Sequence, residues 1–495
     1  MVMWSWRNQI KTSRWGVNSS NHMAFQKQLP KKSEDLSAWY NALVLQAELA
    51  DYGPAKGTMI FRPYGYAIWE AIQRELDKEI KRRGVENAYF PLFIPENLLH
   101  KEKEHVKGFS PELAVVTIGG GETLQEPLIV RPTSETIMYD TFSRWIQSWR
   151  DLPLQINQWN NVVRWEKRTY LFLRTTEFLW QEGHTAHATH EEALVMVNWA
   201  METYTKLYRD LFALPGYVGR KSESEKFAGA DMTLTYETMM PEGKALQSCT
   251  SHDLGQNFAK SFDIQFQAKD GSRQYAWQTS WGLSTRSIGG LIMAHGDDKG
   301  LRLPPKLAPI QIVILPVRAE DGIITACKTI AENLEKVGYR TKLDGEEGQT
   351  IGWKINKWEL RGVPLRIEIG NKEIEAGVMT IVRRDTNEKM QIRIDDAVEK
   401  IGETLEHIQK NLLSQAEALL KNSTHEVTEW EDFEKRMEGE RGFLKSFWCG
   451  RSECETRIKE QTKATTRCLA EEGGKGKCIF CGEEALEKWY FAQAY

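Results

Sequence analysis

The 495-residue sequence has no stretch approaching the ~20 consecutive apolar residues of a membrane-spanning helix, so we expect no membrane partner. The N-terminus lacks the apolar core of a secretory signal, which argues against an oxidising compartment and a disulfide framework. A large excess of positive charge is also missing. The formal net charge of −4 argues against indiscriminate nucleic-acid binding but allows a local basic surface. The length predicts about three or four globular domains.

Acidic residues are absent from the first 33 positions, whose charges are all basic. These are Arg7, Lys11, Arg14, Lys27, Lys31 and Lys32. The composition resembles an organellar transit peptide, and the alternative is a disordered basic tail or a start at Met23. We favour the alternative, so we expect a disordered extension at 1–33 and a cytoplasmic protein.

Hydrophobic periodicity predicts mixed secondary structure in the first 300 residues. A helix is expected to begin at Ser33, and a second to span about 65–83. A strand with prolines is expected at 89–95. Short runs at 161–166 and 172–175 have the pattern of a hairpin, which suggests an antiparallel sheet lining a site.

The pattern changes after Leu303-Pro304-Pro305, which is typical of a linker. Strands at 310–315 and 365–369, with a helix at 322–337, predict a compact α/β domain. A long amphipathic helix is expected at about 394–421. No internal repeat is visible.

Four of the seven cysteines form two close pairs near the C-terminus. They are Cys449, Cys454, Cys478 and Cys481. Their spacing is that of a tetrahedral zinc site with four thiolate ligands, which normally stabilises a small module instead of catalysing a reaction. Disulfides are the competing interpretation, disfavoured by the missing signal peptide. Cys249, Cys327 and Cys468 are expected to be free thiols.

Three separated segments, at 131–135, 164–178 and 281–286, place arginines beside carboxylates or hydroxyls. One such arginine is usually part of a surface ion pair, but the order of the three is specific. The sequence resembles the class II aminoacyl-tRNA synthetases, with 84–91 similar to the first motif, 164–178 to the second and 282–286 to the third. More narrowly, 131–135, 178–187 and 250–255 are similar to prolyl-tRNA synthetases of the archaeal and eukaryotic type.

The resemblance covers about 34–495 and implies three domains. These are an α+β catalytic domain on an antiparallel sheet at 34–305, an α/β anticodon-binding domain at 306–405 and a small zinc-binding domain at 406–495. It implies a homodimer, with Pro91 at the subunit interface, that activates L-proline with ATP and Mg²⁺ and transfers it to the 3′ end of tRNA(Pro). Arg174 and Arg286 are only 112 positions apart (286 − 174), which leaves no room for the editing insertion of bacterial-type enzymes. Tyr495 is expected to reach toward the catalytic domain.

Amino-acid activation brings two anions together, because a carboxylate attacks the α-phosphate of ATP, so arginines and Mg²⁺ must spread the charge. By resemblance, Arg164 bridges the proline carboxylate and the α-phosphate, and it is catalytic together with Arg286. Thr133 and Glu135 bind the amine of proline, and His252 lines the same pocket. The other implied nucleotide contacts are Glu166, Arg174, Thr175, Phe178, Gln247 and Ser284, with Arg174 and Arg286 on the outer phosphates and Phe178 on adenine.

Several alternatives stay open at this point. The spacing of His184, His187 and His190 allows a metal site, although no carboxylate pattern completes a ligand set. A paralogue that binds RNA without catalysis, or a class II enzyme for threonine or glycine, would also share the motifs. The intact arginines argue against the first, and the Thr133, Glu135 and His252 set argues against the second.

The anticodon-binding domain offers several side chains for single-stranded bases, which are recognised by stacking and edge hydrogen bonds. Those chemically suited are Trp358, Glu359, Arg383 and Arg384. Trp353 is expected to pack in the core instead.

Overall fold

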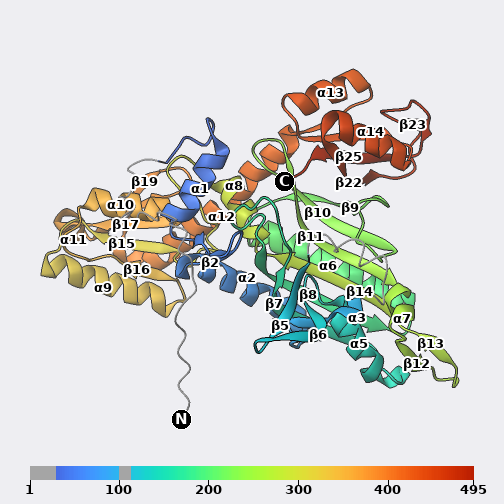
Figure 1. The fold of residues 1–495 in the computed structure, drawn as a ribbon. Coiled ribbons are helices and arrows are strands. Elements are labelled where there is room, and N and C mark those ends of the chain that lie inside the picture. The colour runs from blue at the N-terminus through green and yellow to red at the C-terminus, as the bar shows by residue number, and fades with distance from the viewer. Residues whose placement is uncertain (1–28, 100–112) are drawn as a thin grey trace, which may run out of the picture.

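The computed structural model describes residues 29–99 and 113–495, and three domains follow one another along the chain (Figure 1). Residues 1–28 of the predicted disordered extension lie outside the described residues. Residues 29–33 are ordered, contrary to expectation. Leu29 is buried, and the Lys32 ammonium donates to the carbonyls of Met293 and Gly296 at 2.7 Å. These carbonyls lie at the C-terminal end of a helix, where a cation is favoured.

A seven-stranded sheet forms the centre of the first domain, in the order β3-β7-β8-β14-β11-β10-β9. Its neighbouring strands are antiparallel, apart from the parallel pair β3 and β7. The strands are β3 (Glu86–Asn87), β7 (Leu154–Val163), β8 (Glu177–His187), β9 (Gly216–Arg220), β10 (Met232–Met239), β11 (Ala245–Gly255) and β14 (Trp277–Ser284). The predicted α+β fold on an antiparallel sheet is therefore confirmed.

The prediction that 161–166 and 172–175 are the two strands of a hairpin was wrong. β7 pairs instead with β8, from Val163 opposite Glu177 to Leu154 opposite Ala186. Residues 164–176 form the connection, in which Phe172 adopts a left-handed φ of 62° that a strand does not allow. The two strands are thus longer than predicted, and the arginine-rich segment is a loop between them.

Four helices share the main hydrophobic core with this sheet. They are α1 (Leu36–Gln46), α2 (Pro63–Arg82), α6 (His190–Asp210) and α8 (Arg286–His295). Local signals set their starts: Asp35 accepts from the backbone N–H of Ala38 at 2.9 Å, and Pro63 stands in the first turn of α2. The first two helices begin and end close to their predicted positions.

The opposite part of the sheet carries a second core, to which α5 (Glu135–Trp145) and α7 (Asn257–Ser261) contribute. Smaller sheets surround it. One joins β4 (Phe93–Pro95), β6 (Glu122–Val130) and β5 (Ala114–Gly119), next to the short helix α3 (Glu96–Leu99). Another pairs β12 (Gln265–Gln267) with β13 (Arg273–Tyr275). A further small sheet, β1 (Ala50–Tyr52) with β2 (Met59–Phe61), packs against the main core instead. Of the strand predicted at 89–95, only the second half forms.

The second domain is an α/β layer with the sheet order β16-β15-β17-β18-β19. Its strands are β15 (Ile312–Pro316), β16 (Thr341–Leu343), β17 (Leu365–Ile369), β18 (Val378–Arg383) and β19 (Lys389–Arg393). Its helices are α9 (Asp321–Lys336), α10 (Ile351–Leu360), α11 (Asn371–Ala376) and α12 (Ala397–Asn422). The predicted strands and helices of this region are all present, and α12 continues past residue 405, where we expected the domain to end.

The two tryptophans of α10 are buried and exposed in the reverse of the predicted way. Trp358 is buried and donates from Nε1 to Asp344 at 2.7 Å, whereas the ring of Trp353 is exposed. Arg384 is also buried, and its guanidinium pairs with Asp297 of the first domain at 2.6 Å. Trp358 and Arg384 therefore have structural roles, because Trp358 is paired within the second domain and Arg384 is paired with the first domain.

The C-terminal domain is built on the sheet β20-β21-β25-β22. Its elements are β20 (Thr424–Glu426), α13 (Trp430–Glu438), β21 (Phe443–Trp448), α14 (Ser452–Thr462), β22 (Ala464–Glu471), β23 (Gly476–Lys477), β24 (Glu484–Ala485) and β25 (Glu487–Gln493). The backbone N–H of Tyr495 donates to the carbonyl of Ala245 in β11, and its ring packs on the main core. The chain end thus reaches the catalytic sheet, as predicted.

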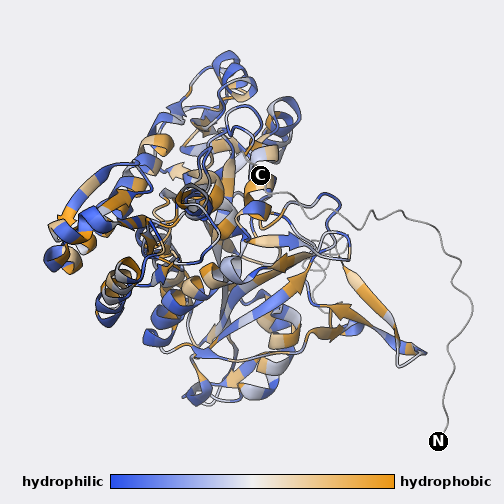
Figure 2. Ribbon diagram, turned by 90° about the vertical axis from the view of Figure 1, so that its left-hand side faces the viewer, coloured by the Kyte–Doolittle hydropathy of each residue, from blue (hydrophilic) through white to orange (hydrophobic). Residues whose placement is uncertain are grey.

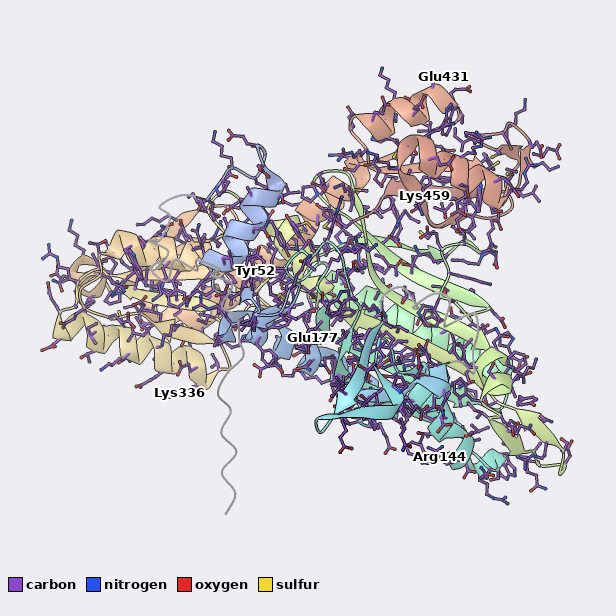
Figure 3. The ribbon with its side chains drawn as sticks, in the orientation of Figure 1. Tyr52, Arg144, Glu177, Lys336, Glu431 and Lys459 are labelled. Carbon is purple, nitrogen blue, oxygen red and sulfur yellow. The ribbon has the colours of Figure 1, made fainter. Side chains whose placement is uncertain are left out.

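Hydrophobic residues concentrate on the strands and on the inner sides of the helices (Figure 2). Charged side chains such as Lys336, Glu431 and Lys459 extend outward from the helices (Figure 3). Within the described part of the chain, each helix is too short or too polar to traverse a lipid bilayer.

Gly183 offers a test of how tightly the sheet is packed. A Cβ at this position of β8 would stand 2.2 Å from ring carbons of Trp281, whereas a Cβ at Gly282 of β14 would meet nothing nearer than a carbonyl oxygen at 3.3 Å. We expect Gly183→Ala to destabilise the domain by about 1–3 kcal/mol, the usual effect of overpacking, and to lower the melting temperature. Gly282→Ala is the control, and equal melting temperatures for the two variants would contradict the predicted packing.

Candidate active site

Two adjoining cavities, of about 210 and 140 Å³, open at the face of the central sheet. They share Arg164, Phe178, Ser284 and Arg286. The larger cavity also contains Thr133, Glu135, Gln247 and His252, and the smaller one Glu166, Arg174 and Thr175. The structure therefore brings every residue that we expected to bind proline or ATP to one of two connected spaces.

Three strands (β8, β11 and β14), the starts of two helices (α5 and α8) and the loop between β7 and β8 position most of these side chains. Arg164 and Arg174 lie in the loop between β7 and β8, Ser284 ends β14, and Arg286 begins α8. α8 begins beside the cavity without a side-chain cap from Thr285, so the positive end of its dipole lies there, and the backbone N–H of Arg286 donates to Ser284 Oγ at 3.3 Å. Such a helix start is suited to an anionic group.

Three guanidinium groups converge where the cavities meet. Burial and the positive charges of Arg164 and Arg174 lower the pKa of Arg286 to about 10. Two of the arginines are anchored by backbone carbonyls at 3.1 Å: Arg164 donates from Nε to Pro132, and Arg286 donates from Nε to Leu173. Arg286 therefore stays cationic at neutral pH, and guanidinium groups suit the oxygens of a polyphosphate.

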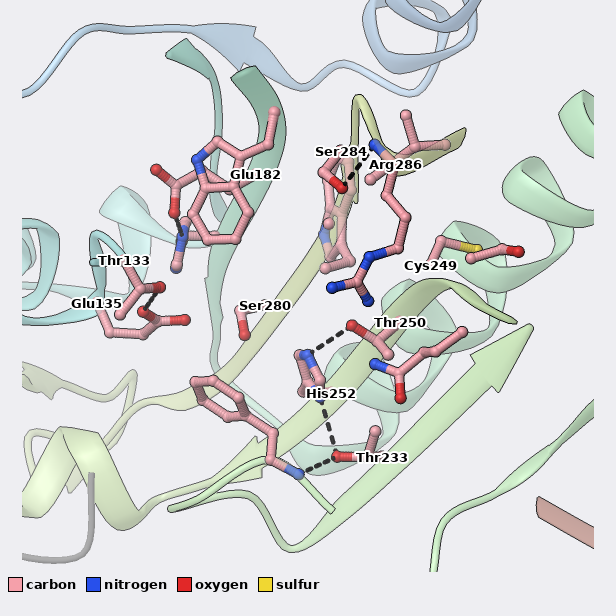
Figure 4. Close-up of a pocket in the computed structure, with 18 of the residues that line it drawn as sticks. Thr133, Glu135, Glu182, Thr233, Cys249, Thr250, His252, Ser280, Ser284 and Arg286 are labelled. Carbon is pink, nitrogen blue, oxygen red and sulfur yellow. Dashed lines mark hydrogen bonds and ion pairs between the residues drawn. The ribbon is translucent and has the colours of Figure 1, made fainter. Parts of the chain in front are cut away.

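The other end of the larger cavity carries carboxylates and a neutral imidazole. Thr133 donates its hydroxyl to Glu135, and both side chains are buried (Figure 4). Burial and the nearby His184 lower the pKa of His252 to about 3, so its ring is uncharged at physiological pH. Because Glu135 is buried at the start of α5, it is not a solvated acid on a surface turn. An ammonium group fits this end, and a carboxylate fits the arginine end.

A buried polar network beside Glu135 was missed in the sequence. Glu182 accepts from Ser134, Gln158 and Asn160 at 2.5–3.1 Å, and its other oxygen pairs with His184 at 3.0 Å. Burial alone would raise the pKa of Glu182, but these partners hold it below its ordinary value. The carboxylate therefore remains charged. Burial alone would lower the pKa of His184, but its contact with Glu182 raises that pKa, so the two form a buried ion pair beside the ammonium end.

The sequence did contain a signal for this network, in the alternation of side chains along β8. Phe178, Trp180, Glu182 and His184 occupy every second position of β8 and all line the larger cavity. Successive side chains of a strand point to opposite faces, so a period of two would have placed them together. Ser280 of β14 lies on the same face, between Glu135 and His252 (Figure 4).

The histidine metal site is not supported. His184 contacts Glu182 and Tyr139, and His190 pairs instead with Asp253 at 2.6 Å. Burial lowers the pKa of His187 to about 4, with Thr185 as its hydrogen-bond partner. Within 29–99 and 113–495, these histidines belong to no group of three or more ligands that are close enough to hold one ion.

The four predicted cysteines do form such a group. Their Sγ atoms all lie within 4.8 Å of one another, and Cys449 and Cys454 are 3.6 Å apart. A disulfide requires about 2.05 Å, whereas tetrahedral ligands at Zn–S distances of about 2.3 Å are separated by roughly 3.8 Å. Arg451 donates to Cys449 and Cys481, which would offset thiolate charge. The cluster could hold zinc, and Cys249, Cys327 and Cys468 are free thiols as predicted.

Comparison with known proteins agrees with this chemistry. Residues 120–295 match the "tRNA synthetase class II core domain (G, H, P, S and T)", 311–404 match the "Anticodon binding domain", and 430–495 match "Prolyl-tRNA synthetase, C-terminal".

Whole-length relatives extend the match. The chain is 49% identical to the proline–tRNA ligase of Natranaerobius thermophilus (96% of this chain, 100% of the relative) and 52% identical to that of Chlorobaculum tepidum (94% and 99%). The crystal structure of prolyl-tRNA synthetase from Cryptosporidium parvum, complexed with halofuginone and AMPPNP, is 43% identical, with a TM-score of 0.91 over 94% of this chain and 99% of that one. The chain therefore belongs to the prolyl-tRNA synthetase family of class II aminoacyl-tRNA ligases, and its activity is the ATP-dependent ligation of proline to tRNA.

Proposed function

We propose that proline and MgATP occupy the larger and the smaller cavity, with Arg164 between them. The observation that carries this assignment is the position of Arg164, which lines both cavities together with Arg286. A guanidinium at this junction can bind the proline carboxylate and the α-phosphate at once. The relative from Cryptosporidium parvum was solved with AMPPNP, an ATP analogue, which supports the nucleotide half of the proposal.

The reaction then needs positioning and charge compensation but no protein nucleophile. A carboxylate oxygen of proline attacks the α-phosphorus, the bond to the bridging oxygen breaks, and diphosphate leaves. Arg174 and Arg286 hold the outer phosphates, and Glu166, Thr175, Phe178 and Ser284 of the smaller cavity bind the nucleoside part. Gln247 of the larger cavity contacts the nucleoside across the junction of the two cavities. In the second step a terminal hydroxyl of tRNA(Pro) attacks the carbonyl carbon of prolyl-adenylate, and AMP leaves.

Selection of proline rests on the opposite end of the larger cavity. Glu135, held by Thr133, accepts hydrogen bonds from the secondary ammonium, and the buried Glu182–His184 pair lies beside it. The neutral ring of His252 and the ring of Phe227, with centroids 4.6 Å apart, wall the space for the pyrrolidine. The second and third domains, at 306–405 and 406–495, bind the anticodon region and a structural zinc ion. We place the enzyme in the cytoplasm.

The homodimer is part of the same proposal. Exposed hydrophobic side chains gather near the first motif, at Tyr89, Phe93, Val115 and Ile118. Tyr89 is 70% exposed and lies two residues after β3. Large apolar side chains left in water at one place mark an interaction surface.

The central prediction concerns Arg164. Arg164→Ala removes charge compensation at the reacting centre, so proline-dependent ATP–pyrophosphate exchange should fall by about 10²-fold or more. Arg168→Ala is the matched control, because Arg168 is an exposed arginine of the same loop. Near-native turnover of Arg164→Ala would refute the assigned role.

The dimer can be tested by sedimentation at micromolar concentration, where the native chain should behave as a dimer. Phe93→Glu buries a charge in the proposed interface and should shift the protein toward monomer. Val337→Glu, which alters an exposed valine of the second domain, should leave the dimer intact. A native protein that sediments only as monomer would contradict the proposal.

Metal analysis should find one zinc ion per chain. Cys478→Ser should abolish the zinc and lower the stability of the C-terminal domain, because a four-thiolate site contributes directly to folding. Cys468→Ser, at a buried free thiol of the same domain, should retain the metal. Equal zinc content in the two variants would rule out the assigned ligand set.

A further inference from the structure

The C-terminal domain contacts the catalytic sheet along its edge strand β9. Gly219 allows the close approach, since a Cβ there would stand 2.2 Å from the carbonyl oxygen of Leu469 in β22. The rings of Tyr217 and Tyr490 stack with centroids 4.2 Å apart. Arg220 at the end of β9 pairs with Glu487 at 2.8 Å.

The segment that follows β9, residues 221–227, is fixed from the C-terminal side. Lys221 lies 3.2 Å from buried Glu237, which also pairs with Arg467 of β22 at 2.7 Å. The next contacts involve Glu455 in the first turn of α14. Its carboxylate accepts from the hydroxyl of Ser222 at 3.0 Å and also from the hydroxyl of Ser224.

The far end of the same segment forms a wall of the larger cavity. Glu225 and Phe227 line it, and the backbone N–H of Phe227 donates to Thr233 Oγ1 at 3.0 Å. Thr233 in turn contacts His252 Nδ1 at 2.9 Å (Figure 4). A continuous series of contacts thus leads from the Glu455 carboxylate to the wall where the proline ring is placed.

The chemistry of Glu455 suits a fixed anchor. The residue is only 6% exposed, and its carboxylate also accepts from Thr466 within the C-terminal domain. A buried carboxylate bound by three hydroxyls leaves little freedom to any of them, and charge-assisted hydrogen bonds are the stronger kind. Two of those hydroxyls belong to segment 221–227 and the third belongs to the C-terminal domain, so Glu455 joins the segment to that domain.

We propose that Glu455 is a positioning residue for the amino-acid pocket: from the C-terminal domain it holds segment 221–227 so that Phe227 and His252 keep the geometry that binds proline. This inference rests on the proposed placement of proline in the larger cavity. It makes the C-terminal domain part of substrate recognition. The nucleotide end is independent of it, because the smaller cavity contains no residue of 221–227.

The test measures proline affinity by calorimetry and the KM values for proline and ATP in pyrophosphate exchange. Glu455→Ala should weaken proline binding by about tenfold, the factor expected from one lost charge-assisted hydrogen bond, with the KM for ATP and kcat little changed. Glu455→Gln keeps an acceptor and the side-chain shape, so it should restore most of the affinity. Glu453→Ala, which removes an exposed acid from the same helical turn, should behave as the native enzyme.

A second pair of changes separates positioning from loss of folding. Ser222→Ala with Ser224→Ala breaks the same contact from the catalytic side and should also weaken proline binding, and adding Glu455→Ala should then cost little more. Unchanged proline affinity in both sets, or a parallel loss of proline and ATP affinity, would overturn the proposal. A native enzyme that binds proline without exchange would instead count against the proposed chemistry alone.

Discussion

Repulsion among like charges is the constraint that the rest of this structure has to meet. Arg164, Arg174 and Arg286 converge in one small space, and only Glu166 among the residues of the smaller cavity offers them a carboxylate. Without other contacts, repulsion would drive these three side chains apart. Backbone carbonyls of Pro132 and Leu173 prevent this by accepting from two of the guanidinium groups, which fixes them without neutralising them. The positive charge of the cluster can then face two anions that must approach each other.

The charge separation across the site follows from the same design. Carboxylates lie at one end and guanidinium groups at the other, so a zwitterionic amino acid has a single favourable orientation. The imidazole between them must not carry charge, and burial of His252 ensures this by lowering its pKa to about 3. A protonated ring there would repel both the ammonium and the neighbouring arginines. The β7-β8-β14-β11 part of the sheet supplies the rigid frame in which these opposite requirements coexist.

The fold and the residues that line the two cavities were predictable where a motif or a simple period carried them. The α/β domain, the cysteine cluster and the residues around Arg164 and Arg286 belong to this group. The predictions failed where long-range partners decide the outcome. The sequence of α10 does not reveal that Trp358 will meet Asp344, and that of 164–176 does not reveal the left-handed Phe172. Glu182 was missed although its alternation with His184 was visible, because a buried carboxylate is expected only where its partners are known, and those lie on β7 and before α5.

Buried ionic groups, and not apolar area alone, set the relative placement of the three domains. Arg384 of the second domain binds Asp297 of the first with two hydrogen bonds, at 2.6 and 2.9 Å. Arg467 of the third domain and Lys221 share Glu237, whose pKa is held below its ordinary value by these cations despite burial. Removing one member of such a buried group typically costs about 3–5 kcal/mol, because the remaining charge is left without a partner. Apolar surfaces can slide past each other at little cost, whereas a small shift between two domains breaks these ionic pairs. A rotation of the third domain would therefore separate Arg467 from buried Glu237, and the strand that Glu237 occupies is the one that carries Thr233 to the amino-acid pocket.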